Sequence, residues 1–376
     1  MSVDFSSRWA WVDVHTGLIQ HNVAIVAERI APTKIWAVVK ANGYGHGSVE
    51  VARAALAAGA TGLCVALVDE GVVLRRAGIT APILLLSEQP EESADLVVGY
   101  ELTPTICTTR GAAVIGNSAS RQGKNVKVHI KVDTGMHRVG IDPSAVRQLI
   151  SYMGSQPSLE IEGLYTHFAV ADDPTHPANE KQLGLFNGVI DDLASMGINP
   201  PLIHAANSAA ALARPDARFS MVRLGIAMYG LLPGPGVKEQ CAGLIPALSL
   251  KARVSAVRWI KAGEAVSYGL RTPVDADTLI ATVPIGYADG VPRLLTTAAV
   301  PVLINGVPRT LAGTVTMDQI MINCGQDSMV TVGDEVVLIG RQGDHVVTAD
   351  QWADAIGTIG YEIVCGMSPR LFRRYQ

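Results

Sequence analysis

Short apolar runs alternate with helical patterns through the first two-thirds of this 376-residue chain. Runs of this length, bounded by turn-forming residues, are typical of strands buried on both faces, as in a parallel sheet. Eight such strands predict a (β/α)8 barrel of the TIM type, an α/β fold whose active site lies at the carboxyl ends of the strands. The expected strands span residues 35–39, 62–66, 83–86, 102–106, 126–132, 161–166, 202–205 and 222–226.

Helical patterns fill most of the intervals between these strands, at residues 48–58, 69–77, 145–153 and 180–196. A doubly wound open sheet is the competing architecture for strand–helix alternation. It is disfavoured by the eight-fold strand count and because the first strand-to-helix turn lacks a GxGxxG motif.

The pattern of apolar runs and helices changes at the Pro/Gly stretch 231–236, which indicates a domain boundary. Alternating runs follow, separated by Gly, Pro, Asn and Asp turns, and long helical patterns become scarce. We therefore expect a barrel domain at 1–240 and a β-rich domain at 241–376, with the extreme N-terminus a candidate to pack on the second domain. The expected strands there span 248–257, 279–284, 300–304, 321–324 and 336–339, with one helix at 349–356.

Composition excludes several classes of function. Hydrophobic residues make up 48% and charged residues 17%, so the chain can bury a large core. A formal net charge of −4 and the lack of a basic cluster argue against nucleic acid as a partner. Five scattered cysteines without a CxxC pair fit buried thiols in a reducing compartment. With neither a signal peptide nor a membrane-spanning run, we expect a cytoplasmic protein without a membrane partner.

Lys40 ends the first expected strand, and a loop with Gly43, Tyr44, Gly45 and Gly47 follows it. A lysine that leaves an apolar strand at the mouth of a cleft can reach its neutral, nucleophilic form. That amine is what an aldehyde cofactor needs for a Schiff base, and the glycines would let the backbone approach a phosphate. An ordinary lysine at a strand end, followed by a glycine loop, fits the local pattern equally well.

Other polar residues also fall at the ends of expected barrel strands. Lys131 and Asp133 end the fifth strand, His167 ends the sixth, and Asn207 and Ser208 follow the seventh. Each has a structural alternative: a hydrogen-bonded core histidine, or an ion pair between Lys131 and Asp133. Within the eighth strand lies Arg223, which must find acceptors because an uncompensated buried cation is costly.

Nine segments resemble the alanine racemases, in that family's order along the chain: AVVKANGYGHG, KVDTGMHRVG, THFAVAD, HAANSAAAL, VRLGIAMYG, VSYG, VPIGYADG, TMDQ and TIGYEIVCGMSPR. The resemblance implies a fold-type III enzyme with pyridoxal 5′-phosphate as cofactor. It also implies a head-to-tail homodimer, in which each active site lies between one subunit's barrel and the other's C-terminal domain. The implied activity interconverts L-alanine and D-alanine, supplying D-alanine for peptidoglycan synthesis.

The resemblance also implies roles for individual residues. Lys40 matches the Schiff-base lysine, and Tyr268 matches the second catalytic base, contributed by the partner subunit. Arg223 matches the arginine that faces the pyridine nitrogen, and Arg138 the arginine that contacts the substrate carboxylate. The remaining matches are His167 beside Arg138 and Arg223; Tyr44, Ser208, Gly225, Ile226 and Tyr361 in the phosphate cradle; Met317, contributed by the partner subunit, at the substrate carboxylate with Asp318 beside it; Tyr287 with Tyr361 at the substrate entrance; and Lys131, a lysine that is carbamylated in many members. No metal ligand is implied.

The reaction itself explains why two bases are needed. Racemisation removes a proton from one face of the α-carbon and returns it to the other, so two bases must flank that carbon. Neither a lysine nor a tyrosine is a good base at its usual pKa near 10, so both need neighbours that favour the deprotonated form, and nearby arginines could serve Tyr268.

The chain departs from the family pattern in two places, at Gly43, where alanine is commoner, and at residues 313–316 before the TMDQ methionine. Three alternative functions stay open. A broad amino-acid racemase, acting for example on serine, would differ in pocket volume. A decarboxylase of this fold type typically has an acidic residue where Arg223 stands. A non-catalytic pyridoxal-phosphate carrier would lack the second domain and Tyr268.

Overall fold

The computed structural model describes residues 7–327 and 329–376, which divide into two compact units. The barrel unit comprises Ile19–Gly43 and Ser48–Leu244. The C-terminal unit comprises the described residues before 19, the short segment Tyr44–Gly47, and the described part of Ile245–Gln376. Its last segment therefore begins at Ile245, a few residues after the expected boundary at 241.

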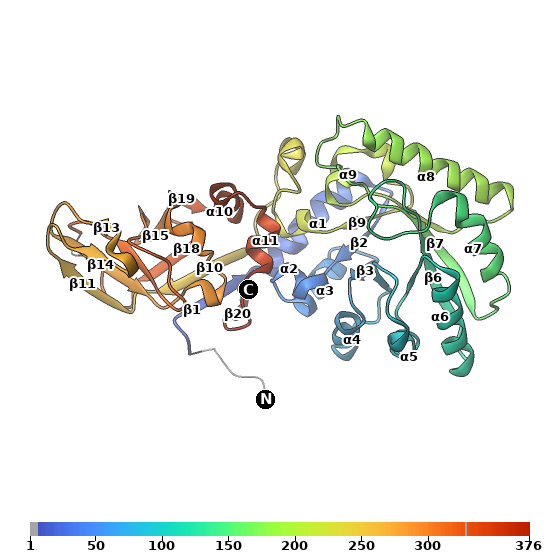
Figure 1. Cartoon of the computed structure of the whole chain (residues 1–376), viewed down its shortest axis with the longest axis horizontal. Coiled ribbons are helices and arrows are strands. Elements are labelled where there is room, and N and C mark those ends of the chain that lie inside the picture. The colour runs from blue at the N-terminus through green and yellow to red at the C-terminus, as the bar shows by residue number, and fades with distance from the viewer. Residues whose placement is uncertain (1–6, 328) are drawn as a thin grey trace. The chain divides into compact units, whose positions relative to one another are not determined.

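Eight parallel strands form the barrel in the described part of the chain, and each coincides with an apolar run expected to be a strand (Figure 1). The ring closes because the last strand pairs with the first, with Ile35 opposite Val222. A parallel bridge from Leu84 to Thr103 and a hydrogen bond from Ser220 N to Ile203 O join the two four-stranded halves. The expected (β/α)8 barrel is confirmed. The strands are β2 (Lys34–Val38), β3 (Gly62–Val65), β4 (Ile83–Leu85), β5 (Thr105–Ile106), β6 (Val126–Lys131), β7 (Leu159–Tyr165), β8 (Leu202–His204) and β9 (Met221–Leu224).

Helices connect successive strands and bury one face each. In α7 (Val146–Met153), the buried residues Val146, Leu149, Ile150 and Met153 recur at the spacing of one helical face. The four expected helices are present within two residues of their expected ends, while the other five helices of this part were not predicted. The other helices of this part are α1 (Thr16–Ile30), α2 (Lys40–Tyr44), α3 (Ser48–Ala57), α4 (Val68–Arg76), α5 (Ala94–Gly99), α6 (Thr109–Arg121), α8 (Ala178–Ser195) and α9 (Ser208–Ala213), with 3-10 turns η1 (Glu91–Ser93), η2 (Pro143–Ala145), η3 (Pro215–Ala217), η4 (Ile226–Tyr229), η5 (Pro235–Val237) and η6 (Glu239–Cys241).

The C-terminal unit is rich in β-structure, as expected. Its main sheet has the order β16-β15-β18-β10-β1-β20 with β19 beside β18, and a second sheet has the order β11-β14-β17. The apolar run at 248–257, expected to be one strand, is divided between these two sheets. The strands are β1 (Ala10–Val14), β10 (Leu248–Arg253), β11 (Ala256–Ile260), β12 (Ala265–Val266), β13 (Thr272–Pro273), β14 (Thr278–Val283), β15 (Val302–Ile304), β16 (Val307–Arg309), β17 (Ile320–Asn323), β18 (Glu335–Gln342), β19 (His345–Val347) and β20 (Phe372–Tyr375).

Strand β1 lies in this main sheet next to its edge strand β20, between β10 and β20. The first described residues of the chain therefore belong to the C-terminal unit. Helix α10 (Ala349–Ile356) covers the expected span and begins at Thr348, whose hydroxyl accepts a hydrogen bond from Gln351 N. Helix α11 (Gly360–Cys365) follows it and was missed. The remaining 3-10 turns are η7 (Tyr268–Leu270), η8 (Tyr287–Asp289) and η9 (Arg293–Thr296).

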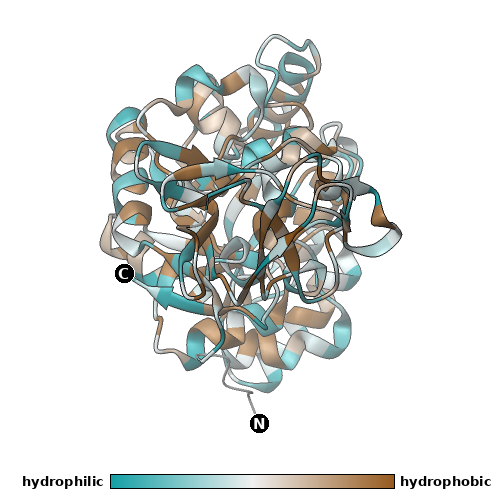
Figure 2. Cartoon of the chain, turned by 90° about the vertical axis from the view of Figure 1, so that its left-hand side faces the viewer, coloured by the Kyte–Doolittle hydropathy of each residue, from teal (hydrophilic) through white to brown (hydrophobic). Residues whose placement is uncertain are grey.

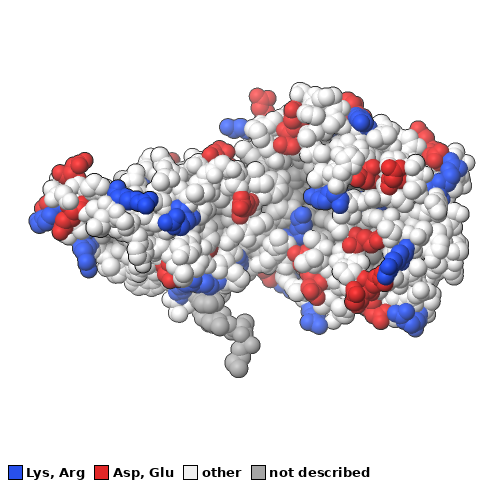
Figure 3. Space-filling view, in the orientation of Figure 1, with Lys and Arg blue, Asp and Glu red and all other residues white. Residues whose placement is uncertain are grey.

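Apolar residues follow the strands, while the helices alternate apolar and polar faces (Figure 2). Strand β10 shows the alternation of a sheet with one buried face, since Leu248, Leu250 and Ala252 point inward. Acidic and basic side chains are scattered in small groups of both signs over the face drawn in Figure 3. Among the described residues, no helix is long and apolar enough to cross a bilayer.

Candidate active site

Basic side chains gather at the carboxyl ends of the barrel strands. Lys40 follows β2, Lys131 ends β6, His167 follows β7 and Arg223 lies in β9. Burial, then the charges of Arg223 and Arg138, lower the pKa of Lys131 to about 8. Burial also holds the pKa of His167 well below its usual value, and the charges of Arg223, Arg138, Lys131 and Lys40 lower it further. The barrel fold therefore brings these residues into one electropositive mouth.

Arg223 is a buried cation whose hydrogen bonds all go to neutral acceptors. Its guanidinium donates to His204 Nδ1 at 2.7 Å and to His167 Nδ1 at 3.1 Å. It also donates to the carbonyl oxygens of Thr166 at 2.8 Å and Ala205 at 2.9 Å. Burial lowers its pKa. Arg223 therefore finds the acceptors that it requires in neutral groups, and it takes no part in the ion pairs found among the described residues.

The alternative that Lys131 and Asp133 form an ion pair is wrong. The Asp133 carboxylate instead accepts hydrogen bonds from the backbone N–H groups of Gly135 and His137, each at 3.0 Å. Burial raises the pKa of Asp133, but these hydrogen bonds outweigh burial and lower it overall. Lys131 Nζ donates to Leu86 O at 3.4 Å and lies 5.5 Å from the centre of the Tyr165 ring. Asp133 therefore orders the turn that leads to Arg138, which is exposed.

A tight left-handed turn follows Lys40. Ala41, Asn42 and Gly43 all have positive φ, and the Asn42 side chain accepts a hydrogen bond from Ser48 N at 3.1 Å. Glu70 joins this turn to the end of β3, because its carboxylate accepts from Ala41 N at 2.6 Å and Ala66 N at 2.8 Å. Glycine at position 43 suits its left-handed conformation, which an alanine would adopt with strain.

The phosphate-cradle residues expected in the barrel come together. The Ser208 hydroxyl accepts hydrogen bonds from Gly225 N at 2.9 Å and Ala227 N at 3.3 Å, which joins the start of α9 to the turn containing Ile226. Tyr44 and Tyr361, the other two expected cradle residues, both lie in the C-terminal unit, with ring centres 6.1 Å apart.

Tyr268 projects from the surface of the C-terminal unit at the start of η7. Thr314 Oγ1 donates to Tyr268 O at 3.3 Å, and Ser267 Oγ donates to Thr314 O at 3.1 Å. Gly313 packs so closely that an added Cβ would lie 2.5 Å from the Ser267 side chain. The segment 313–316, where the chain departs from the family pattern, therefore supports the turn that carries Tyr268.

Met317 and Tyr287 lie on adjoining turns of the same unit. Ala288 N donates to Met317 O at 3.0 Å, and Tyr287 N donates to Thr316 O, also at 3.0 Å. Beside them, Arg370 pairs with Asp318 at 2.7 Å. The Tyr287 turn is anchored by Asp289, which is fully buried and accepts from Gly286 N at 3.0 Å while pairing with Arg8 and Arg370.

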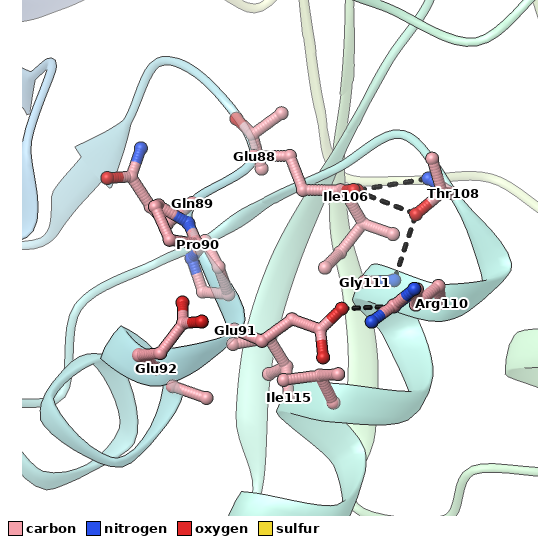
Figure 4. A pocket seen from close by; sticks show the side chains of 14 residues that line it. Glu88, Gln89, Pro90, Glu91, Glu92, Ile106, Thr108, Arg110, Gly111 and Ile115 are labelled. Carbon is pink, nitrogen blue, oxygen red and sulfur yellow. Dashed lines mark hydrogen bonds and ion pairs between the residues drawn. The ribbon is translucent and has the colours of Figure 1, made fainter.

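A cavity of about 350 Å³ opens between the loops after β4 and β5 (Figure 4). Its wall includes Glu91, which pairs with Arg110, and Glu88, whose carboxylate accepts from Thr108 N at 3.0 Å. None of the expected site residues lines this cavity. The carboxylates of Glu88 and Glu91 are already engaged, and the candidate site lies elsewhere.

Sequence reasoning missed four barrel side chains near Arg223: His129, His204, Tyr165 and Glu162. Tyr165 stacks on His204 with ring centres 4.6 Å apart and lies under Arg223 at 5.0 Å. A usable signal was present, because residues 127, 129 and 131 alternate along β6 and share one face of a strand. That spacing places His129 on the same side as Lys131.

Two family descriptions match the chain: "Alanine racemase, N-terminal domain" at residues 14–233 and "Alanine racemase, C-terminal domain" at residues 247–375. The chain is 44% identical over 368 residues to the alanine racemase of Symbiobacterium thermophilum, covering 98% of this chain and 97% of that protein. It is 42% identical to the alanine racemase of Thermobifida fusca, covering 98% of each.

Solved structures agree with these sequence matches. The alanine racemase of Bacillus anthracis with bound L-Ala-P superposes with a TM-score of 0.91 at 40% identity, over 98% of this chain and 95% of that one. A histidine racemase from Leuconostoc mesenteroides superposes with a TM-score of 0.92 at 30% identity, over 99% of each chain.

Proposed function

This chain belongs to the alanine racemase family, and from that premise we propose that it interconverts L-alanine and D-alanine with pyridoxal 5′-phosphate as cofactor. The observation that carries the proposal is the electropositive mouth of the barrel. The charges of Lys40, Lys131, Arg138 and Arg223 all act on His167 there, and both the cofactor phosphate and the substrate carboxylate are anions.

The barrel residues fit the cofactor. Lys40 would hold it covalently through its amine, and the backbone around Ser208, Gly225 and Ile226 would receive the phosphate, with Tyr44 and Tyr361 completing the cradle. When bound, the cofactor would spread the negative charge left on the α-carbon into its ring. Arg223 would face the ring nitrogen with His167 beside it, and a fixed cation there disfavours protonation of that nitrogen.

Two bases would move the proton at the α-carbon, Lys40 on one face and Tyr268 of a second copy on the other. Arg138 of one copy and Met317 of the second copy would hold the substrate carboxylate, with Asp318 beside Met317. This division is supported by the exposure of Tyr268, which projects from a turn fixed by its own unit. The low pKa of Lys131 would leave its amine partly neutral, the form that carbamylation requires.

The experiment that tests a shared site mixes two inactive variants, Lys40→Ala and Tyr268→Phe. In a random mixture half of the dimers are mixed, and one of the two sites in each mixed dimer has both bases, so about a quarter of normal activity should return. No recovery despite demonstrated subunit exchange would place both bases within one chain.

A broader amino-acid racemase is the second candidate, and the similarity to a histidine racemase favours keeping it. Tyr287 and Tyr361 would set the width of the substrate entrance. Turnover of alanine, serine and histidine by the purified protein decides between the two. Equal rates for the bulky substrates would contradict the narrow specificity. A non-catalytic carrier is not supported, because the chain has the second family domain.

The biological role that follows is the supply of D-alanine for peptidoglycan in the cytoplasm. Five free cysteines fit a reducing compartment. Growth of a bacterial strain that requires D-alanine should be restored by this chain and not by its Lys40→Ala variant.

A further inference from the structure

A line of hydrogen-bonded side chains connects Arg223 to Glu162 inside the barrel. Arg223 Nη1 lies 2.7 Å from His204 Nδ1, and His204 Nε2 lies 2.9 Å from His129 Nδ1. His129 Nε2 then lies 3.4 Å from the Glu162 carboxylate. Arg223, His204 and His129 are buried, and the Glu162 side chain is largely buried.

The two ends of this line fix the proton positions between them. A guanidinium can only donate hydrogen bonds, and a carboxylate can only accept them. His204 and His129 must therefore each be neutral, with the proton on Nε2. Burial lowers the pKa of both imidazoles, and the positive charge of Arg223 lowers it further. The hydrogen bond from His129 is the largest cause that lowers the pKa of Glu162, to about 2.

The backbone is shaped to allow this line. The pairing of β6 with β7 shifts between Val128 and His129, which leaves Glu162 as an extra residue in β7. Gly163 stands opposite His129, and a Cβ added there would lie 2.5 Å from its Nδ1. A strand irregularity and a glycine thus make room for one histidine ring and aim one carboxylate at it.

Other charged groups face this line from neighbouring elements. Lys127 pairs with the outer oxygen of Glu162 at 2.9 Å and is exposed. On the Arg223 side the facing titratable groups are Tyr165, Cys64, His167, Lys131 and Arg138. Glu162 is thus the anion that the hydrogen-bonded line joins to Arg223.

We propose that Glu162, through His129 and His204, supplies the counter-charge and the fixed acceptor that orient Arg223 at the barrel mouth. These three are positioning residues, because they would not contact the substrate. An anion connected through two polarised imidazoles offsets a buried cation without standing beside it. Arg223 therefore keeps one orientation, and no carboxylate competes with the anionic ligands. The kinetic consequence, though not the proton arrangement, rests on the proposed function.

The first test is nitrogen NMR on the full-length protein at neutral pH. Nitrogen-15 shifts of both buried imidazoles should show neutral rings with the proton on Nε2, with and without added pyridoxal phosphate. A proton on Nδ1 of His204, or a charged imidazolium at either position, would overturn the inference. This measurement does not depend on whether the protein is a racemase.

The second test compares Glu162→Gln, which removes the charge and keeps the shape, with two controls. Glu160→Gln removes the same charge from an exposed position on the same strand, and Lys127→Gln breaks the ion pair without altering the line. In Glu162→Gln, kcat should fall about tenfold with KM unchanged, as for partners that orient a functional group without touching substrate. Both controls should stay within about twofold of the parent.

Equal kcat values for Glu162→Gln and Glu160→Gln would overturn the role of the carboxylate. If the unaltered protein had no racemase activity, the proposed function would fall, while the NMR measurement would still decide the proton arrangement.

Discussion

The two units differ in how far they bury the residues of the proposed site. In the barrel unit, Arg223 is 3% exposed and Lys131 is 5% exposed, and both are held by contacts within the barrel. In the C-terminal unit, Tyr268 is 77% exposed, Met317 52% and Tyr287 42%, although the turns that carry them are fixed. Arg223 and Lys131 are thus buried within the barrel, whereas the three residues of the C-terminal unit are exposed on turns that their own unit holds in place.

The two units also compensate their buried charges in different ways. Arg223 in the barrel has only neutral acceptors in contact, while Asp289 in the C-terminal unit pairs with Arg8 and Arg370. A carboxylate in direct contact with Arg223 would cancel the positive charge that attracts anions. Because only neutral acceptors contact Arg223, the barrel mouth keeps that attraction. In the C-terminal unit the paired charges hold the Tyr287 turn in place, while the tyrosine side chain itself stays exposed.

The largest effect expected from either unit is that of replacing Lys40 in the barrel. Lys40→Ala should lower kcat for alanine more than about 10⁴-fold, because it removes both the covalent anchor and one base. Circular dichroism of alanine solutions measures the rate. Lys34→Ala, at the other end of β2, is the control and should retain activity. Comparable losses in both variants would show that the strand, rather than the Lys40 amine, matters.

The matching change in the C-terminal unit should leave the cofactor in place. Tyr268→Phe should lower kcat by about 10²–10⁴-fold, because it removes one positioned base. The visible absorbance of the lysine-bound cofactor should be unchanged, since the phenol is not needed to hold it. Tyr152→Phe, on α7, serves as the control. Near-normal turnover in Tyr268→Phe would break the division of labour between the halves.

The tight packing of the barrel interior can be tested by adding one methyl group. Gly163→Ala should lower the free energy of unfolding by about 1–3 kcal/mol, because the new Cβ would overlap the His129 ring. Gly188→Ala, in α8, meets open space and should raise it by up to about 1 kcal/mol. Urea denaturation measures both. A neutral Gly163→Ala would mean that the interior is looser than its contacts indicate.

The smallest effect concerns the charge of Lys131. Its pKa of about 8 in the folded chain lies below the usual 10.5, so between these values the unfolded chain binds more protons. Lys131 should therefore contribute a rise of about 1–2 kcal/mol to the free energy of unfolding between pH 7.5 and 9.5, measured as the difference between the parent and Lys131→Met because the buried thiols of Cys64 and Cys107 change it in the opposite direction. Lys131→Met should remove that rise. Lys127→Met should keep it, because Glu162 raises the pKa of Lys127 out of the window.

Local patterns were enough to predict the architecture. Each of the eight barrel strands coincides with an apolar run of strand length, the pattern expected of strands in a covered parallel sheet. The position of Lys40 after the first barrel strand followed from the same pattern. Helices α1, α2, α5, α6, α9 and α11 and the strand β1 were not predicted. Helices α5 and α9 have six residues each, too few for a periodic pattern to stand out, and they are stabilised by the elements on which they pack. Helix α6, by contrast, has a regular buried face, and its pattern could have been used.

The sequence by itself determined the barrel, the β-rich unit and the strand ends at which polar residues collect. Only the tertiary structure decided which of those side chains meet. His129 bonds to His204 across 75 positions and to Glu162 across 33, and Asp133 turns to its own loop instead of to Lys131. Periodicity along a strand fixes the face on which a side chain lies. Its partner depends on the register between distant strands, and one extra residue in β7 changes that register.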